Sequence, residues 1–269
     1  MYLAARNYPL TTRYSVREMF PRIKHAGYDG LEFCLTNSFQ QLRPDTIEAF
    51  YRHHVREEAE KNDLKISMVS CHPDSTYDDV LFAFQKRAIP IIRDFGTNLF
   101  LIGTNYNYFA GLNQKLRRDD LEYRKKFFER MRELLSIAEG NGVQIVVEPE
   151  PSFALLSAAE YFELYDAMGS KNLSYNFDVG HAFLTEADLF DAIRALKGHI
   201  VHTHFENLRR GEHWHHLPLD GDIDLQKAVD TLAEIGYDGA ICMEVHAYDQ
   251  LSPQCVVPMQ TMLKRSQEK

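Results

Sequence analysis

The stretch Tyr175-Asn-Phe-Asp-Val-Gly-His181 is followed, after one amphipathic segment, by His199-Ile-Val-His-Thr-His204. Each part has the pattern of a short apolar strand that ends in a side chain able to bind a metal, Asp178 in the first and His204 in the second. The segment between them is long enough for one helix, so the unit is predicted to be strand, helix, strand. Parallel strands joined in this way place their carboxyl ends at the same edge of a sheet. Asp178 and His204 are therefore expected to lie close together.

Two other apolar runs end in the same way. Gln-Ile-Val-Val leads to Glu148, and Ala-Ile-Cys-Met leads to Glu244. A single acidic residue at a strand end is more often a helix cap or part of a loop salt bridge than a metal ligand. Four strands that all end in Asp, Glu or His are harder to explain in that way, because three converging carboxylates without a cation repel one another. We therefore predict a metal site formed by Glu148, Asp178, His204 and Glu244.

The predicted ligand set contains three carboxylates and one imidazole. Zinc sites in proteins are usually richer in nitrogen and sulfur, whereas carboxylate oxygens suit harder ions. The sequence therefore predicts one divalent metal ion, with Mn²⁺, Mg²⁺ and Co²⁺ as candidates beside Zn²⁺, and does not choose among them.

Apolar runs and helical segments alternate along the whole chain. The expected strands are residues 2–6, 31–35, 65–71, 98–103, 143–148, a run ending at 178, 200–204 and 240–244. The expected helices are residues 15–25, 46–61, 77–95 with a break at Pro90, 119–139 ended by Gly140, 157–168, 187–196, 224–235 and 252–265. Strands alternating with helices imply a parallel sheet, and eight such units in about 250 residues imply a closed (β/α)₈ TIM barrel of the α/β class. No linker or change in composition divides the chain, so residues 1–269 are expected to form a single domain.

The composition excludes some classes of function. A formal net charge of −9 argues against a protein dedicated to nucleic acid or to an anionic membrane, since such proteins normally carry a basic patch. No apolar run reaches the length that spans a bilayer, and residues 1–9 do not have the pattern of a secretory signal. The four cysteines are scattered, which predicts reduced thiols and a cytoplasmic location. A large helical outer surface leaves room for a homo-oligomer.

Further polar residues are expected near the mouth of the barrel, where loops build the active sites of this fold. His181 can cap the next helix or contact a substrate, and we favour substrate contact. The polar loop after His204 contains His215 and His216, at least one of which should face the site. His202 alternates in phase with His204 and is expected one layer deeper, in a supporting role. Weaker candidates for substrate contact are Glu32, His72 and Glu150, and the aromatic residues Tyr106, Tyr108, Phe109 and Trp214 would suit a ring-shaped ligand.

These motifs together resemble the xylose isomerase-like TIM-barrel superfamily over nearly the whole chain. The residues that carry the resemblance are Val-Val-Glu148-Pro-Glu-Pro, Asn-Phe-Asp178-Val-Gly-His181, Val-His-Thr-His204-Phe-Glu-Asn, Leu-Pro-Leu-Asp-Gly-Asp-Ile-Asp224 and Met-Glu244-Val. The superfamily includes sugar and sugar-phosphate isomerases and epimerases, inosose-processing enzymes and the endonuclease IV type of DNA-repair nuclease. The resemblance implies the same four metal ligands, with His181 and Arg209 at positions that contact substrate in ketose epimerases. The spacing of the loop that follows His204 departs from the commonest family pattern.

The resemblance implies an isomerase or epimerase that acts on a small carbohydrate through a metal-stabilised enediolate. Glu148 and Glu244 would then move the proton. A metal-dependent lyase or dehydratase of an inosose-like compound and a sugar-binding protein without activity are alternatives. The nuclease branch needs additional histidines, of which His72 could be one. Strand four has no histidine where that branch needs one, so DNA cleavage is the less favoured alternative.

Overall fold

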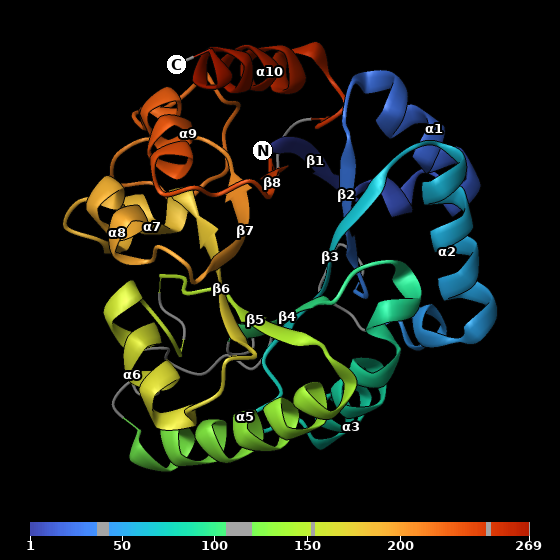
Figure 1. The fold of residues 1–269 in the computed structure, drawn as a ribbon, viewed down its shortest axis with the longest axis vertical. Helices are drawn as coiled ribbons and strands as arrows, with labels where there is room; N and C mark the ends of the chain where they lie inside the picture. Colours follow the sequence, from blue (N-terminus) through green and yellow to red (C-terminus); the bar gives the residue numbers. More distant parts are fainter. Residues whose placement is uncertain (37–42, 106–119, 152–153, 246–248, 269) are drawn as a thin grey trace.

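The computed structural model describes residues 1–36, 43–105, 120–151, 154–245 and 249–268 (Figure 1). Eight parallel strands form a closed barrel, in which each strand pairs with the next and β8 pairs with β1. The strands are β1 (Tyr2–Arg6), β2 (Gly30–Cys34), β3 (Lys65–Pro73), β4 (Leu99–Asn105), β5 (Gln144–Val147), β6 (Leu173–Asp178), β7 (Ile200–Phe205) and β8 (Ala240–Met243). The predicted (β/α)₈ barrel is thus confirmed.

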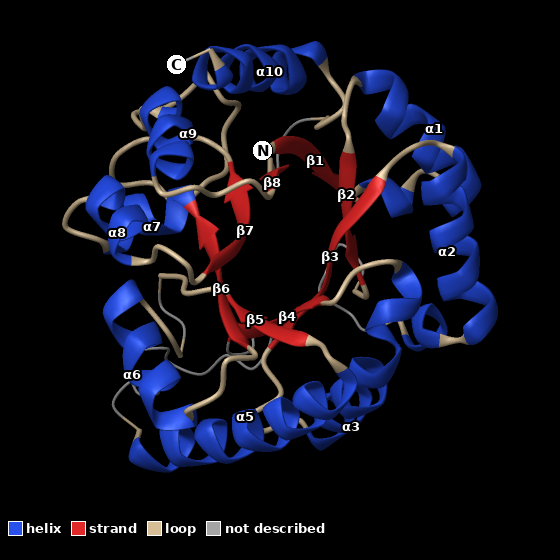
Figure 2. Cartoon of the chain, viewed as in Figure 1, coloured by secondary structure: helices blue, strands red, loops and turns tan. Residues whose placement is uncertain are grey.

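Helices surround the barrel as an outer ring, as Figure 2 shows. The α-helices are α1 (Val16–Ala26), α2 (Ala49–Lys61), α3 (Asp79–Ala88), α5 (Leu121–Asn141), α6 (Ala158–Met168), α7 (Val179–Thr185), α8 (Leu189–Ala195), α9 (Leu225–Glu234) and α10 (Pro253–Gln267). Short 3₁₀ helices are η1 (Leu10–Thr12), η2 (Pro44–Ile47) and η3 (Ile89–Phe95). In the described part of the chain, no helix combines the length and the hydrophobicity needed to cross a membrane.

Helix α5 shows where the sequence-based boundaries were wrong. Asp120 caps its start by accepting hydrogen bonds from the backbone of the first turn, and residue 119 lies outside the described residues. The helix runs past Gly140, which we expected to end it, and stops at Gly142. Gly142 has a φ of 64°, a left-handed conformation that ends helices and that glycine adopts without steric cost. Gly140 and Gly142 are the same residue type, so it is the backbone conformation that decides which of them ends the helix.

The interruption expected near Pro90 is confirmed. The segment predicted over 77–95 divides into α3, which ends at Ala88, and η3, which contains Pro90, because proline cannot donate the backbone hydrogen bond that a continuous helix needs. Helix α7 was not predicted. It starts directly after β6, with Asp178 as its N-cap: the side chain of Asp178 accepts a hydrogen bond from the backbone N–H of His181. This residue therefore ends a strand and begins a helix.

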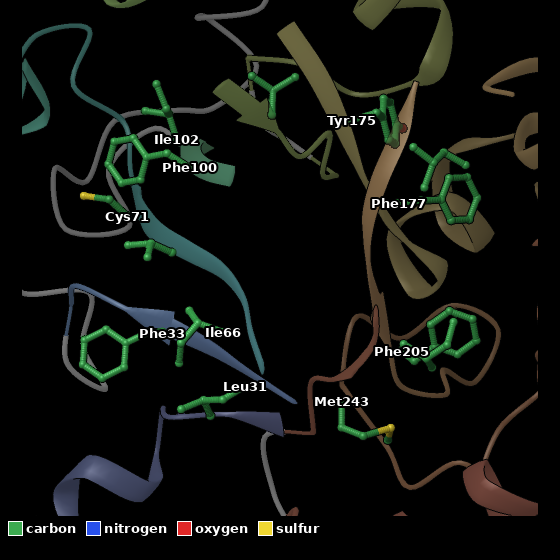
Figure 3. Packing of buried hydrophobic residues seen from close by; sticks show 14 of the residues in the cluster. Leu31, Phe33, Ile66, Cys71, Phe100, Ile102, Tyr175, Phe177, Phe205 and Met243 are labelled. Atoms are coloured by element: carbon green, nitrogen blue, oxygen red, sulfur yellow. The ribbon is translucent and has the colours of Figure 1, made fainter. Parts of the chain in front are cut away.

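Successive side chains along each strand point to opposite sides of the sheet and so lie in two different environments. Leu31, Phe33, Phe100 and Phe177 project toward the helices and belong to one large apolar core between the strands and the outer ring (Figure 3). Each such side chain stabilises the fold by about 1.5–3 kcal/mol through burial. Their neighbours in sequence point the other way, into the barrel, where Glu32 is completely buried. The outer core thus orients polar side chains toward the barrel axis.

Candidate metal centre

The four residues that end β5, β6, β7 and β8 meet at the mouth of the barrel. One ligand atom from each of Glu148, Asp178, His204 and Glu244 lies within 4.8 Å of the others. The Nδ1 atom of His204 is 2.7 Å from a carboxylate oxygen of Glu148, 2.8 Å from one of Glu244 and 3.9 Å from Oδ2 of Asp178. The structure therefore brings together the set predicted from strand ends, and one ring nitrogen faces three carboxylates.

Asp178 has one oxygen that the protein leaves unsatisfied. Its Oδ1 accepts from the backbone of His181, whereas its buried Oδ2 has no hydrogen-bond partner among the described residues. Burial, together with the nearby charges of Glu148 and Glu244, raises the pKa of Asp178 to about 8. Buried carboxylates this close together are costly to keep ionised without positive charge to balance them. A divalent ion bound by these oxygens would supply that charge, so the donor set fits a metal.

Glu206 extends the acidic cluster, and sequence reasoning missed it. The side chain is completely buried, and its Oε1 accepts a hydrogen bond from the backbone of Gly180. Burial and the adjacent Asp178 raise its pKa well above the usual range for a glutamate. Glu206 follows His204 by two positions, so the alternation that related His202 to His204 could have found it.

Glu32 contacts the ring nitrogen of His204 that points away from the four-residue cluster. Its Oε2 lies 2.6 Å from Nε2 of His204, and its Oε1 accepts a 2.6 Å hydrogen bond from the hydroxyl of Ser70. A shift in strand register between Leu31 and Glu32 accompanies this arrangement. Although burial alone would raise it, the charges of Arg6 and His204 hold the pKa of Glu32 well below its usual range. We expected Glu32 to contact a substrate; the structure places it, completely buried, on the far side of the His204 ring.

A second chain of hydrogen bonds leads deeper into the barrel. The Nδ2 atom of Asn176 lies 3.0 Å from Nδ1 of His204, and its Oδ1 atom lies 2.9 Å from Nδ1 of His202. The other ring nitrogen of His202 lies 3.1 Å from the hydroxyl of Ser67. Burial lowers the pKa of His202 to about 3, so its ring is neutral at ordinary pH. His202 therefore has the buried, deeper position expected from its alternation with His204.

Arg6 is the second residue that sequence reasoning missed. It ends β1, is buried, and forms ion pairs with Glu32 and with Glu244. Its Nη2 also lies 2.7 Å from Nε2 of His72, whose other ring nitrogen is 3.5 Å from Glu148. Burial opposes its charge, but the two carboxylates raise the pKa of Arg6 well above its usual value, so it remains a cation. The rule that strand ends build the site would have found Arg6 had it been applied to all charged residues.

Three histidines form a neighbouring group at the mouth. The ring nitrogens of His181, His213 and His215 lie close enough together to hold a metal ion. Burial and the two other histidines lower the pKa of His181 well below the usual value, which leaves its ring neutral. His181 also approaches the first group, with Nδ1 3.7 Å from Asp178 and 3.8 Å from Glu148. Sequence reasoning did not single out His213, although it alternates with His215 around Trp214.

Glu150 lies beside this group. Its Oε1 is 3.8 Å from His181 and 4.0 Å from His213. Burial and the charges of Glu148 and Glu244 raise its pKa well above the usual range. Glu150 is therefore placed where it can hold a proton next to the cluster.

The remaining candidates lie elsewhere on the loop after β7 or outside the described residues. The Nδ1–H of His215 donates a 2.9 Å hydrogen bond to the backbone oxygen of Glu244, so His215 is the one of the two adjacent histidines that faces the site. His216 instead pairs with Glu212 and Asp220. Arg209 is half exposed and pairs with Asp220 within the same loop. Trp214 is half exposed, whereas Tyr106, Tyr108 and Phe109 fall outside the described part of the chain.

Residues 20–266 match the protein family described as xylose isomerase-like TIM barrel. An uncharacterised protein of Methanocaldococcus jannaschii is 31% identical over 123 residues, which make up 44% of this chain and 42% of that protein. The inosose dehydratase of Lacticaseibacillus casei is 29% identical over 120 residues, or 38% of this chain and 40% of the dehydratase. The matched segments thus span about two fifths of the length of these curated relatives.

Among solved structures, an L-ribulose 3-epimerase has a TM-score of 0.76 against this chain. The match covers 99% of this chain and 96% of the epimerase, at 17% sequence identity. At this level of identity the similarity shows a shared fold.

Proposed function

Since the chain belongs to the xylose isomerase-like TIM-barrel family, we propose that it is a divalent-metal-dependent isomerase or epimerase of a small sugar, a sugar phosphate or a related polyhydroxy carbonyl compound. The observation that carries the proposal is the convergence of Glu148, Asp178, His204 and Glu244 at the mouth. The buried Oδ2 of Asp178, which has no hydrogen-bond partner among the described residues, supports a bound cation, as does the raised pKa of this residue. The epimerase with the same fold supports the reaction class.

The bound ion would polarise the carbonyl group of the substrate and make the neighbouring C–H bond more acidic. Glu148 and Glu244 reach the cluster from β5 and β8, and each offers a carboxylate that can accept a proton. One of them would remove the proton from carbon. Return of a proton to the same carbon from the other face gives epimerisation, and return to the adjacent carbon gives isomerisation. Positioned acid–base groups of this kind typically contribute about 10²- to 10⁴-fold.

The histidines beside the cluster would orient the substrate. His181 has a neutral ring, which can both donate and accept a hydrogen bond to hydroxyl groups. Glu150, whose pKa is raised, would be protonated and could donate a hydrogen bond to a substrate oxygen. Together with His215, these residues offer the mixed donors and acceptors that a polyhydroxy compound needs. Arg209 would take part only if its loop brought it away from Asp220.

A metal-dependent dehydratase is the second candidate, and the similarity to inosose dehydratase favours it. Removal of a proton next to a carbonyl group is common to both reactions. In the dehydratase a hydroxyl group then leaves, and a protonated acid such as Glu150 would donate the proton that turns it into water. The product separates the two candidates, because an epimerase conserves the mass of the substrate and a dehydratase lowers it by one water.

DNA cleavage is less well supported. Nη2 of Arg6 lies 2.7 Å from Nε2 of His72 and so blocks the nitrogen that a second metal would need. The net charge of −9 also opposes binding to a phosphate backbone.

Metal content and proton exchange test the proposed function together. We expect at least one divalent ion per purified chain, lost in Asp178→Ala and in His204→Ala. Keto- and aldo-sugars would be incubated in D₂O with the loaded protein, and one class should incorporate deuterium at the carbon next to the carbonyl group. Glu148→Gln and Glu244→Gln should abolish this exchange, whereas Glu57→Gln, on the exposed side of α2, should retain it. Exchange that persists in both glutamine variants, or a protein that binds no ion, would refute the proposal.

A further inference from the structure

A third group of possible ligands lies directly behind the proposed metal centre. A carboxylate oxygen of Glu32, the sulfur of Cys34 and a ring nitrogen of His72 lie within 4.8 Å of one another. Glu32 is the middle residue and Cys34 the last residue of β2, and His72 is the last but one of β3. Glu32 and Cys34 are buried, and His72 is largely so. Carboxylate, thiolate and imidazole are together the ligands that zinc and cobalt take in proteins.

The guanidinium group of Arg6 lies against all three of these side chains, in the place that a metal ion would take. Its Nε is 3.3 Å from Glu32, and its Nη2 is 2.7 Å from the ring of His72 and 3.6 Å from the sulfur of Cys34. Its remaining nitrogen, Nη1, pairs with Oε1 of Glu244, so the guanidinium also reaches the proposed metal centre.

A guanidinium group carries hydrogen-bond donors and no acceptor, and it stays charged at all ordinary pH values. The carboxylate of Glu32 and the sulfur of Cys34 present lone pairs to it, as each would to a metal ion, and the ring of His72 lies against the same cation. Arg6 thus satisfies the same electron pairs that a second cation would use, and it does so with a single positive charge.

We propose that Arg6 is a built-in second cation of the centre, which keeps the Glu32, Cys34 and His72 group closed to metal and limits ion binding there to the four-residue site. Oε1 of Glu244 then forms an ion pair with Arg6, and Oε2 faces His204. Arg6 acts as a positioning residue for Glu244 and for Glu32. The positioning role of Arg6 rests on the proposed metal centre. The proposal that the Glu32, Cys34 and His72 group is closed to metal rests only on the contacts of Arg6.

Replacing Arg6 should open the second group to an ion. The variants are Arg6→Ala, which leaves space and removes the charge, and Arg6→Lys, which keeps a cation at the same place. Arg6→Ala/Cys34→Ser removes the sulfur ligand as well. Each would be titrated with Co²⁺, with the number of bound ions measured by elemental analysis. The near-ultraviolet absorption band of cobalt bound to a thiolate reports on Cys34 directly.

We expect Arg6→Ala to bind one ion more per chain than the unsubstituted protein and to show the thiolate band. The unsubstituted protein and Arg6→Lys should show no such band, and Arg6→Ala/Cys34→Ser should lose it. A thiolate band in the unsubstituted protein, or none in folded Arg6→Ala, would overturn the inference. If Arg6→Ala folds only in the presence of Co²⁺, the ion has replaced the guanidinium, as proposed. If it stays unfolded even with Co²⁺ while Arg6→Lys folds, an ion cannot replace Arg6 and the inference fails.

The same titration keeps this result separate from the proposed function. Failure of the four-residue centre appears as equal ion counts in the unsubstituted protein and in Asp178→Ala. Failure of the Arg6 inference appears only in the thiolate band and in the difference made by Arg6→Ala.

Discussion

The Nε2 atom of His204 lies 2.6 Å from Oε2 of Glu32, and both side chains are completely buried within the barrel. A neutral imidazole has one N–H and one lone pair, and the partner of one nitrogen fixes the role of the other. Although burial opposes the charge, Glu148, Glu32 and Glu244 raise the pKa of His204 well above its usual value, so both ring nitrogens carry a proton in the metal-free protein. A metal at the mouth would displace the proton from Nδ1, while Glu32 keeps the one on Nε2. Glu32 therefore selects the form of His204 that can bind a metal at the mouth.

The first prediction tests this relationship. Glu32→Gln keeps the shape of the side chain but removes its charge, so it should weaken the affinity for Mn²⁺ or Co²⁺ by about 10- to 100-fold, as is typical for partners of metal-binding histidines. The dissociation constant would be measured by calorimetric titration, with Glu57→Gln on the exposed face of α2 as the matched control. An unchanged affinity in Glu32→Gln would mean that the tautomer of His204 is fixed by other contacts.

The sequence was sufficient to predict the barrel and the convergence of four side chains, because both follow from the geometry of parallel strands. An inward-facing residue at the carboxyl end of a strand must lie at the mouth of the barrel, whatever its position in the sequence. The same geometry would have found Arg6 and Glu206. Neither was predicted, because Arg6 is a cation and Glu206 follows a strand end that His204 already represented.

Loop positions could not be obtained in this way. The approach of His213 and His215 to His181 depends on the path of the loop after β7, which no periodicity encodes. Placing His215 at the site and His216 away from it required the backbone bridge between Asn207 and His216. Helix ends failed for a related reason, since Gly140 and Gly142 differ in backbone conformation and not in residue type.

The two glycines give a prediction on stability. Gly142→Ala places a side chain on a residue with a φ of 64° and should lower the free energy of unfolding by about 1–2 kcal/mol. Gly140→Ala lies inside α5 with open space around its β position, and should raise it by about 0.5–1 kcal/mol. Urea denaturation of both variants measures the difference. Equal effects of the same sign would contradict the assignment of the helix end.

Asn176 and His202 provide a prediction on buried polar groups. Asn176→Leu keeps the volume but leaves the Nδ1 proton of His202 without its acceptor, which should cost about 1–3 kcal/mol of stability. Asn176→Leu/His202→Leu removes both partners, so its loss should be smaller than the sum of the two single losses. Chemical denaturation of the metal-free protein would measure these two variants and His202→Leu. Strictly additive losses would show that the two side chains do not act as a pair.

The last prediction concerns pH. Burial and the charges of Glu148 and Glu244 raise the pKa of Asp178 to about 8, so the folded metal-free protein holds a proton that the unfolded chain releases near pH 4. The stability of the metal-free protein should therefore fall as the pH rises from about 4 toward 8. A metal binds the deprotonated carboxylate, so its affinity should rise with pH over the same range, by up to about tenfold per pH unit, and binding should release a proton.

Calorimetric titration in buffers of different ionisation enthalpy measures the released proton directly, and thermal melting with and without the ion measures the gain in stability. That gain should be larger at pH 8 than at pH 6. In Asp178→Asn the group that holds the proton is gone, so the residual binding should depend less on pH. Affinity that does not change between pH 6 and pH 8 in the unsubstituted protein would show that another cation already balances Asp178, and His204, 3.9 Å away, would be the first residue to test for that role.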